Sequence, residues 1–324
     1  MPTGVRHSPT GVHSLRGAPG TALLVHALLS ILLQFGWYLL PDGTWGIEKH
    51  GLTGYVLAIV AMQGLCILLP SLLAIGLHGV PGSLVVGRGP VGAGTVLLSL
   101  TLGVPAAVML LSLNNAAVYL IARSGLALPL PILPVEYAAK GLPVLLLLAL
   151  SSAVLPALLE ELMFRGVMQS SMMAVGGRLS AVWLTAVAFA VFHSNPLFLV
   201  APLGAGFILG YLRLHTDSLY PCIAAHLSLN LTIQLIQPLL PQLTANYFTR
   251  YAQTAEPVLY ASLAAFFLSA AVAIPLTLLL GASGRHRKST HMRTVPYPAD
   301  GKYLLATLLL IATIVVVYFA SSAV

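Results

Sequence analysis

The sequence predicts an all-α fold, a polytopic bundle of eight or nine transmembrane helices, from three observations. Hydrophobic residues make up 58% of the 324 residues, and charged residues only 7%, against about 25% in a typical soluble domain. The mean hydropathy of +0.94 leaves too little polar surface to cover a soluble globule of this size. The hydrophobic residues also gather in runs of about 20, the length that a helix needs to cross a bilayer.

This composition excludes a cytosolic enzyme, a disordered chain and a secreted disulfide scaffold. The formal net charge of +7 comes from residues in the predicted loops, where it indicates membrane orientation and contact with lipid headgroups rather than nucleic-acid binding. Cys66 and Cys222 both lie in hydrophobic runs and are predicted to pack, without forming a disulfide or a thiolate metal site.

The elements follow in chain order. Residues 1–20, rich in Gly, Pro, Ser and His, are predicted to form a disordered tail, and residues 21–324 a single membrane domain. The first hydrophobic run is too long for a signal-peptide core and has no small-residue cleavage site, so an uncleaved first span is expected. Nine spans are predicted, with eight as the alternative: Thr21–Pro41, Thr53–His78, Gly94–Ile121, Leu142–Ala174, Leu179–Ser194, Leu197–His215, Ser218–Ile236, Pro257–Leu280 and Tyr303–Ala320.

Basic residues predict the orientation of the bundle. With a cytoplasmic N-terminus, ten lie on the inner side: Arg6, Arg16, Arg88, Arg178, Arg213, Arg285, Arg287, Lys288, Arg293 and Lys302. Four lie on the outer side: Lys49, Arg123, Lys140 and Arg250. Because cytoplasmic loops carry the excess of Lys and Arg, we expect a multi-pass protein of the plasma membrane with its N-terminus in the cytoplasm.

One hydrophobic helix carries an unusual group of charges. Glu160, Glu161 and Arg165 fall within six residues of the fourth span, where each charge is costly to insert. Glu161 and Arg165 are four residues apart and share a helix face, so they can form a buried ion pair. Glu160 points about 100° away from that face. A buried carboxylate without a counter-ion is a candidate general base or acid.

Further polar side chains follow on later spans. His193 ends the fifth span, and His226 and Asn230 share one face of the seventh. Glu160 lies 16 residues before Gly176, and His193 lies 16 residues after Gly177. Two antiparallel helices joined there place both side chains about 24 Å from the same turn. Other lone polar residues are interpreted as interhelical hydrogen-bonding groups or interface residues: His26, Gln34, Gln63 and the Asn114–Asn115 pair.

A carboxylate, two imidazoles and an amide, without an obvious nucleophile, favour hydrolysis by an activated water. In this interpretation Glu160 removes a proton from the water and His193 holds the water. His226 and Asn230 then donate hydrogen bonds to the oxyanion, which typically contributes 10²–10³-fold in rate per donor.

Three motifs carry a family resemblance. Glu160-Glu161-x-x-x-Arg165, Phe189-x-x-x-His193 and His226-x-x-x-Asn230 stand in this order on separate predicted helices. The set resembles the CPBP family of intramembrane proteases (CAAX proteases and bacteriocin-processing enzymes, also called the Abi family). The resemblance covers Glu160 to Asn230, within a predicted catalytic core over residues 142–236 (spans four to seven). It implies peptide-bond hydrolysis with Glu160 as the base, and with Arg165 as a supporting ion-pair partner beside Glu161.

Several alternatives stay open at this point. No cofactor is expected, but zinc held by Glu160, His193 and His226 is an alternative because a carboxylate and two His form a known catalytic ligand set. A catalytically inactive membrane scaffold, an immunity protein or a transporter could use the same fold. As an enzyme, the protein is expected to act on a peptide or protein substrate, in contact with the lipid bilayer and without nucleic acid. A lipidated or membrane-anchored substrate is one option, and the sequence does not identify which substrate is used.

Overall fold

The computed structural model describes residues 9–39, 47–89, 91–123, 141–194, 199–239, 256–284 and 300–322. Within these ranges the chain is helical, and its only β-type pairing is an isolated bridge between Gly87 and Ser218. The helices are α1 (Pro9–Leu39), α2 (Ile47–Met62), η2 (Gln63–Leu68), α3 (Leu69–His78), α4 (Gly82–Val86), α5 (Ala93–Arg123), α7 (Leu142–Ala149), η3 (Leu150–Val154), α8 (Leu155–Glu161), η4 (Leu162–Gln169), α9 (Ser170–Val175), α10 (Arg178–Phe192), α11 (Val200–Thr216), α12 (Tyr220–Leu239), α14 (Glu256–Gly284) and α15 (Gly301–Ser322). The predicted all-α fold is confirmed.

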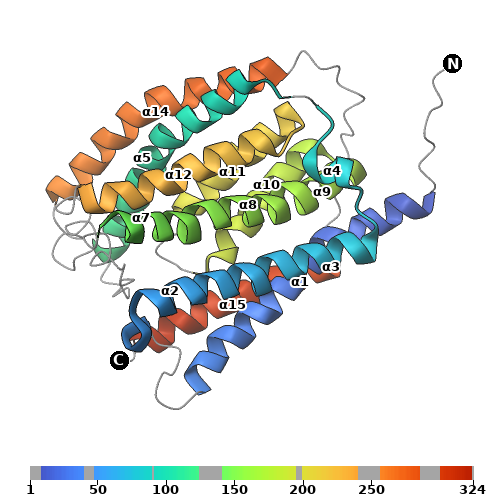
Figure 1. The fold of residues 1–324 in the computed structure, drawn as a ribbon, viewed down its shortest axis with the longest axis horizontal. Helices are drawn as coiled ribbons and strands as arrows, with labels where there is room; N and C mark the ends of the chain where they lie inside the picture. Colours follow the sequence, from blue (N-terminus) through green and yellow to red (C-terminus); the bar gives the residue numbers. More distant parts are fainter. Residues whose placement is uncertain are drawn as a thin grey trace.

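The long run from α7 to α9 lies in the middle of the bundle (Figure 1). On one side, α12 packs against α8 and also against α5, which in turn packs along α14. On the other side, α1, α3 and α15 pack together, and η2 reaches α8. Helix α8 therefore lies between elements from both halves of the chain.

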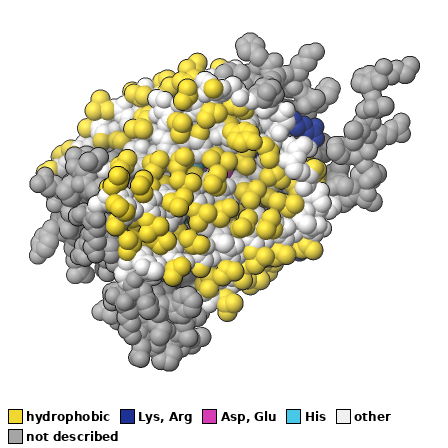
Figure 2. Space-filling model, viewed as in Figure 1, with side chains coloured by type: hydrophobic (Ala, Val, Ile, Leu, Met, Phe, Trp, Pro, Cys, Tyr) yellow, Lys and Arg dark blue, Asp and Glu magenta, His cyan; other side chains and the backbone are white. Residues whose placement is uncertain are grey.

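The protein is an integral membrane protein. Among the described residues, five helical segments are long and hydrophobic enough to cross a membrane: Ser14–Leu33, Gly51–His78, Ala93–Ile121, Leu142–Val175 and Leu259–Ala282. Two shorter hydrophobic helices are Arg178–Phe192 and Gly301–Val316. Hydrophobic side chains cover most of the face in Figure 2, as expected of a surface that contacts lipid. Each of the nine predicted spans coincides with a helix or a run of joined helices, although the number of membrane crossings stays a prediction.

The N-terminal segment differs from its prediction. Helix α1 begins at Pro9, so residues 9–20 are helical rather than part of a disordered tail; residues 1–8 lie outside the described ranges. The Ser14 hydroxyl donates to the His78 carbonyl oxygen at the end of α3 (2.7 Å), and Ala18 is fully buried. Small residues that look like a linker in sequence serve here for close packing, because a Cβ at Gly17 or Gly20 would collide with a neighbouring side chain.

A proline accounts for the widened helical turn at η2. Pro70 has no N–H, so it cannot bond the Cys66 carbonyl oxygen four residues earlier. That oxygen instead accepts a hydrogen bond from His26 Nδ1 on α1 (2.7 Å). The helix continues through η2 with π-type spacing, a local feature that is frequent at functional sites. Gln63 is the first residue of η2.

One end of the bundle, called the α4 end, gathers segments predicted to lie on the inner side. It contains α4, the turn at 176–177 and the turn that joins α11 to α12. The Gly87–Ser218 bridge and a hydrogen bond from Arg178 to the Leu214 carbonyl oxygen hold these segments together. Lys302, at the start of α15, contacts the Thr21 hydroxyl on α1 near the same end. Helix α1 begins at this end and α15 finishes at the opposite one (Figure 1).

Candidate active site

Two adjacent buried carboxylates at the end of α8 have different partners. Glu161 Oε1 accepts hydrogen bonds from Arg165 NH1 (2.7 Å) and from His226 Nδ1 on α12 (2.8 Å). The ion pair between Glu161 and Arg165 is the one that their spacing predicts. The bond from His226 crosses between helices and is not apparent in the sequence. Glu161 thus balances a guanidinium and orients an imidazole.

Glu160 makes no ion pair with Arg165 among the described residues. Its Oε1 accepts a hydrogen bond from Gln63 Nε2 on η2 (2.9 Å), and its Oε2 lies 3.9 Å from His226 Nε2. The second distance is too long for a direct hydrogen bond. The side chains of both Glu160 and His226 are almost fully buried.

The protonation of His226 follows from these contacts. Its Nδ1 carries a hydrogen, because the partner Glu161 oxygen is an acceptor. In the neutral ring, Nε2 is then an acceptor that faces Glu160. Only the doubly protonated ring can donate from both nitrogens. A role for His226 as an oxyanion donor therefore requires an imidazolium ion, for which the two neighbouring carboxylates supply counter-charge.

His193 approaches the same place from α10. It ends that helix at an exposed position, and its Nδ1 donates to the Phe189 carbonyl oxygen (2.7 Å). Its ring is close enough to Glu160 and His226 to interact with them electrostatically. The next residue, Ser194, adopts a left-handed backbone with a φ of 48°, which is sparsely populated by non-glycine residues. The approach of Glu160 and His193 to one depth stays a prediction.

Phe189 is an aromatic contact point within the site. Its ring packs edge-on against His193 and His226, with centroid distances of 5.0 and 5.8 Å. The Arg165 guanidinium lies over the same ring, 4.5 Å from its centroid. The sequence identifies Phe189 as a motif residue but does not indicate this role. The ring orients both imidazoles and covers a buried cation.

Asn230 lies one helical turn after His226 on α12 and is half-buried. Among the residues that the structure describes, none forms a hydrogen bond with its side chain. Four of the six predicted site residues are joined by direct contacts (Glu160, Glu161, Arg165 and His226). His193 is connected to His226 through the Phe189 ring, which packs against both imidazoles. Asn230 is placed beside them only by its position on the helix. Gln63, interpreted from sequence as an ordinary interhelical group, contacts the site directly through Glu160.

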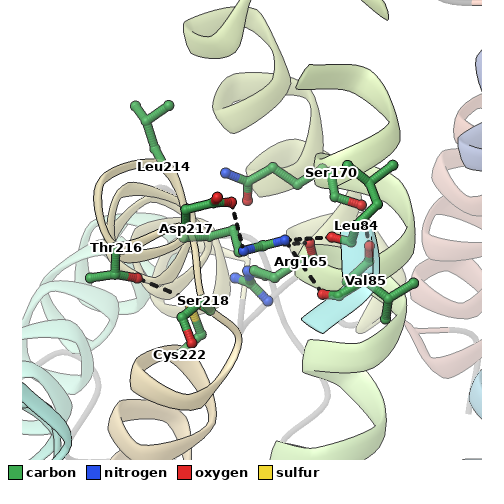
Figure 3. A network of polar contacts seen from close by, with 12 residues as sticks. Leu84, Val85, Arg165, Ser170, Leu214, Thr216, Asp217, Ser218 and Cys222 are labelled. Carbon is green, nitrogen blue, oxygen red and sulfur yellow. Dashed lines mark hydrogen bonds and ion pairs between the residues drawn. The ribbon is translucent and has the colours of Figure 1, made fainter. Parts of the chain in front are cut away.

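Behind the site, Arg213 forms a buried network that the sequence did not reveal (Figure 3). The sequence predicts Arg213 to be an inner loop charge. In the structure it lies within α11 and is 1% exposed. Its guanidinium donates to the carbonyl oxygens of Leu84 (2.6 Å), Val85 (3.4 Å) and Arg165 (3.2 Å). Asp217, half-exposed, completes the network at 3.4 Å. Arg213 therefore links α4 to η4, the helix that carries Arg165, through hydrogen bonds to both.

Replacing Arg213 by Met is expected to destabilise the protein by about 3 kcal/mol or more, because three carbonyl oxygens lose their side-chain donor. Thermal unfolding in detergent measures this loss. Asp217→Asn is the matched control: the exposed ion pair contributes little, and Asn also tolerates the left-handed backbone of this position. Equal melting temperatures for Arg213→Met and the wild type would contradict the assignment of this network.

The zinc alternative is not supported by the placement of its ligands. In the part of the chain that the structure describes, no three His, Cys, Asp or Glu side chains are grouped so as to hold a metal ion. Of the three predicted ligands, Glu160 and His226 lie 3.9 Å apart, between Oε2 and Nε2.

Comparison with known proteins bears on the same helices. Residues 142–232 match the model of a family described as type II CAAX prenyl endopeptidase Rce1-like. No curated protein and no solved structure matches the chain. The matched range runs from the start of α7 into α12 and includes all three motifs. The resemblance to the CPBP family of CAAX proteases is therefore confirmed for residues 142–232, the part of this chain that is similar to the Rce1-like endopeptidases.

Proposed function

We propose that this protein is an intramembrane endopeptidase in which Glu160 activates water. The Rce1-like match indicates an endopeptidase of the CAAX type. The observation that carries the finer proposal is the unequal environment of the two carboxylates. Glu161 is paired with Arg165, whereas Glu160 faces His226 Nε2 across 3.9 Å and has no guanidinium partner among the described residues. Neighbouring carboxyl groups in different environments can serve different roles.

The proposed reaction uses these groups in sequence. A water molecule between Glu160 and the two imidazoles attacks the scissile carbonyl carbon, and its proton passes to Glu160. The new oxyanion accepts hydrogen bonds from Asn230 and from the imidazolium form of His226. The carbon–nitrogen bond then breaks, and protonated Glu160 returns its proton to the departing amine. The products are a carboxylic acid and an amine, which become a carboxylate and an ammonium ion when the acid proton passes to the amine, and Glu160 ends in its starting state.

The substrate class follows from the family description. We propose a peptide with a prenylated cysteine near its C-terminus, whose lipid chain enters the bilayer beside the bundle. The experiment uses purified protein in proteoliposomes with fluorescence-quenched peptides that end in a CaaX sequence, either farnesylated or unmodified. Cleavage of the farnesylated peptide at a markedly higher rate is the expected result. Preference for the unmodified peptide would overturn the lipidated substrate class, and hydrolysis that persists in Glu160→Gln would overturn the role of Glu160.

Chelation is expected to leave most of the hydrolytic rate intact, because the proposed water is activated by Glu160 and His193 rather than by a metal. The measurement compares cleavage before and after dialysis against a strong chelator. A chelator-treated sample that receives one equivalent of zinc serves as the control. Loss of activity on dialysis with recovery on addition of zinc would establish the metal mechanism instead.

We also propose that the α4 end faces the cytoplasm, in the plasma membrane. It carries exposed Ser83, whereas exposed Arg123 ends α5 on the predicted outer side. In whole cells, a membrane-impermeant maleimide is expected to label Arg123→Cys directly and Ser83→Cys only after permeabilisation. Native Cys66 and Cys222 are buried and give little background. The reverse labelling pattern would invert the topology and place substrate access on the outer side.

A further inference from the structure

A buried amide from the first half of the chain touches the proposed base. Gln63 is 8% exposed, and its Nε2 donates to Glu160 Oε1 at 2.9 Å. The two residues are 97 positions apart in sequence. Gln63 also lies outside residues 142–232, the range that matches the Rce1-like family. The site therefore includes a polar contact that this match does not cover.

The contact determines how the carboxylate is turned. The terminal torsion of a glutamate side chain is broad and nearly two-fold, so an unbonded carboxylate can rotate. With Oε1 bonded to Gln63, the other oxygen is held towards His226 Nε2, 3.9 Å away. Hydrogen bonds to a charged acceptor are stronger than those between neutral groups, which favours this single orientation.

The backbone that carries Gln63 is itself held in place. Gln63 is the first residue of η2. Because Pro70 in α3 has no N–H, the Cys66 carbonyl oxygen of η2 accepts a hydrogen bond from His26 on α1 instead. The ring of His26 packs against Phe192, with a centroid distance of 4.5 Å. Phe192 immediately precedes His193 on α10. His26 therefore holds η2, the segment that begins with Gln63, and also packs beside the end of α10, next to His193.

A second buried glutamine separates the effect of burial from the effect of the partner. Gln169 is fully buried, its Nε2 donates to the Gly210 carbonyl oxygen (2.8 Å), and its Oε1 has no partner among the described residues. Gln63 has the same pattern, including a buried Oε1 without a partner among those residues. The difference is that the hydrogen bond of Gln63 ends on the Glu160 carboxylate rather than on the backbone.

We propose that Gln63 is a positioning residue for Glu160: it holds the carboxylate in the orientation and in the charged form that water activation requires. The inference rests on the proposed function for its catalytic meaning, but the contact predicts a change in the chemistry of Glu160 that is measurable without substrate. Gln63→Leu removes the donor with little change in volume. Gln63→Glu places a second carboxyl group against the first, and the two cannot both ionise at this distance.

The first experiment measures the protonation of Glu160 directly. The full-length protein in proteoliposomes is treated with dicyclohexylcarbodiimide, which reacts with protonated carboxyl groups inside membranes. The modified fraction of Glu160 is measured against pH by fragment-ion mass spectrometry, which separates it from Glu161. Loss of the Gln63 bond is expected to move the labelling curve to higher pH by about one unit in Gln63→Leu. Gln63→Glu should move it further, and Gln169→Leu should leave it unchanged.

The second experiment measures hydrolysis of the farnesylated CaaX peptide. Gln63→Leu is expected to lower kcat by about 10–100-fold, the rate equivalent of one hydrogen bond to a charged group, with little change in KM. The acidic limb of its pH–rate profile should move in the same direction as the labelling curve. Gln169→Leu should retain the wild-type kcat.

The outcomes separate this inference from the proposed function. Gln63→Leu with the labelling curve of the wild type would overturn the inference, whatever the state of the hydrolysis assay. If Glu160→Gln keeps full hydrolytic activity, the role of Glu160 as base fails, although a displaced labelling curve would still establish the contact. A displaced curve in Gln169→Leu as large as that in Gln63→Leu would show a general packing effect and would also overturn the inference.

Discussion

Glu160→Gln is expected to reduce peptide hydrolysis by about 10²–10⁴-fold, the usual contribution of a positioned general base, without loss of the folded state. The substitution preserves the shape of the side chain, and its amide oxygen can still accept the hydrogen bond that Gln63 donates in the wild type. Because Glu160 has no guanidinium partner among the described residues, no buried cation loses its counter-charge. Initial rates on the farnesylated CaaX peptide and thermal unfolding of the same preparation measure both parts.

Glu161→Gln, at the adjacent residue, is the control for this result. Glu160 and Glu161 share the same helix end and the same low exposure, so a general effect of altering a buried carboxylate would appear in both variants. A Glu160→Gln protein that unfolds early and keeps its specific activity would assign Glu160 a structural role instead.

Glu161→Gln is expected to destabilise the protein by about 3–5 kcal/mol, the usual cost of removing one partner of a buried ion pair. Glu161 Oε1 accepts hydrogen bonds from both Arg165 and His226. The neutral replacement leaves the fully buried Arg165 guanidinium without a counter-charge. Thermal unfolding in detergent measures this loss as a lower melting temperature, and denaturant unfolding measures it as a lower midpoint. Neither measurement requires an activity assay.

A double variant tests the reason for this loss. Removing the cation as well, in Glu161→Gln with Arg165→Met, is expected to recover part of the stability, because no unpaired buried charge remains. Full additivity of the two single losses would contradict the ion-pair explanation. If Glu161→Gln melts like the wild type while Glu160→Gln unfolds, the division of roles between the carboxylates is wrong.

Much of the fold could be predicted because the rules behind it are local. A bilayer needs about 20 hydrophobic residues per helix, so each run marks its own helix without reference to the rest of the chain. The Glu161–Arg165 pair was predictable for a similar reason, since residues four apart share a helix face. The tail prediction was wrong over residues 9–20 because Gly and Ala also serve close helix packing. Composition does not distinguish that use from a flexible linker.

By itself, the sequence determined an all-helical membrane protein and the order of its three motifs, because hydrophobic length and helical periodicity act within one segment. The tertiary structure alone decided which partners the charged groups meet on other helices. Gln63 reaches Glu160 across 97 residues, and Arg213 reaches Leu84 across 129. No spacing rule relates such positions, because their contact depends on how separate helices pack and on where a proline widens a turn. The contrast between a paired Glu161 and a Glu160 held by an amide is therefore a property of the packed bundle.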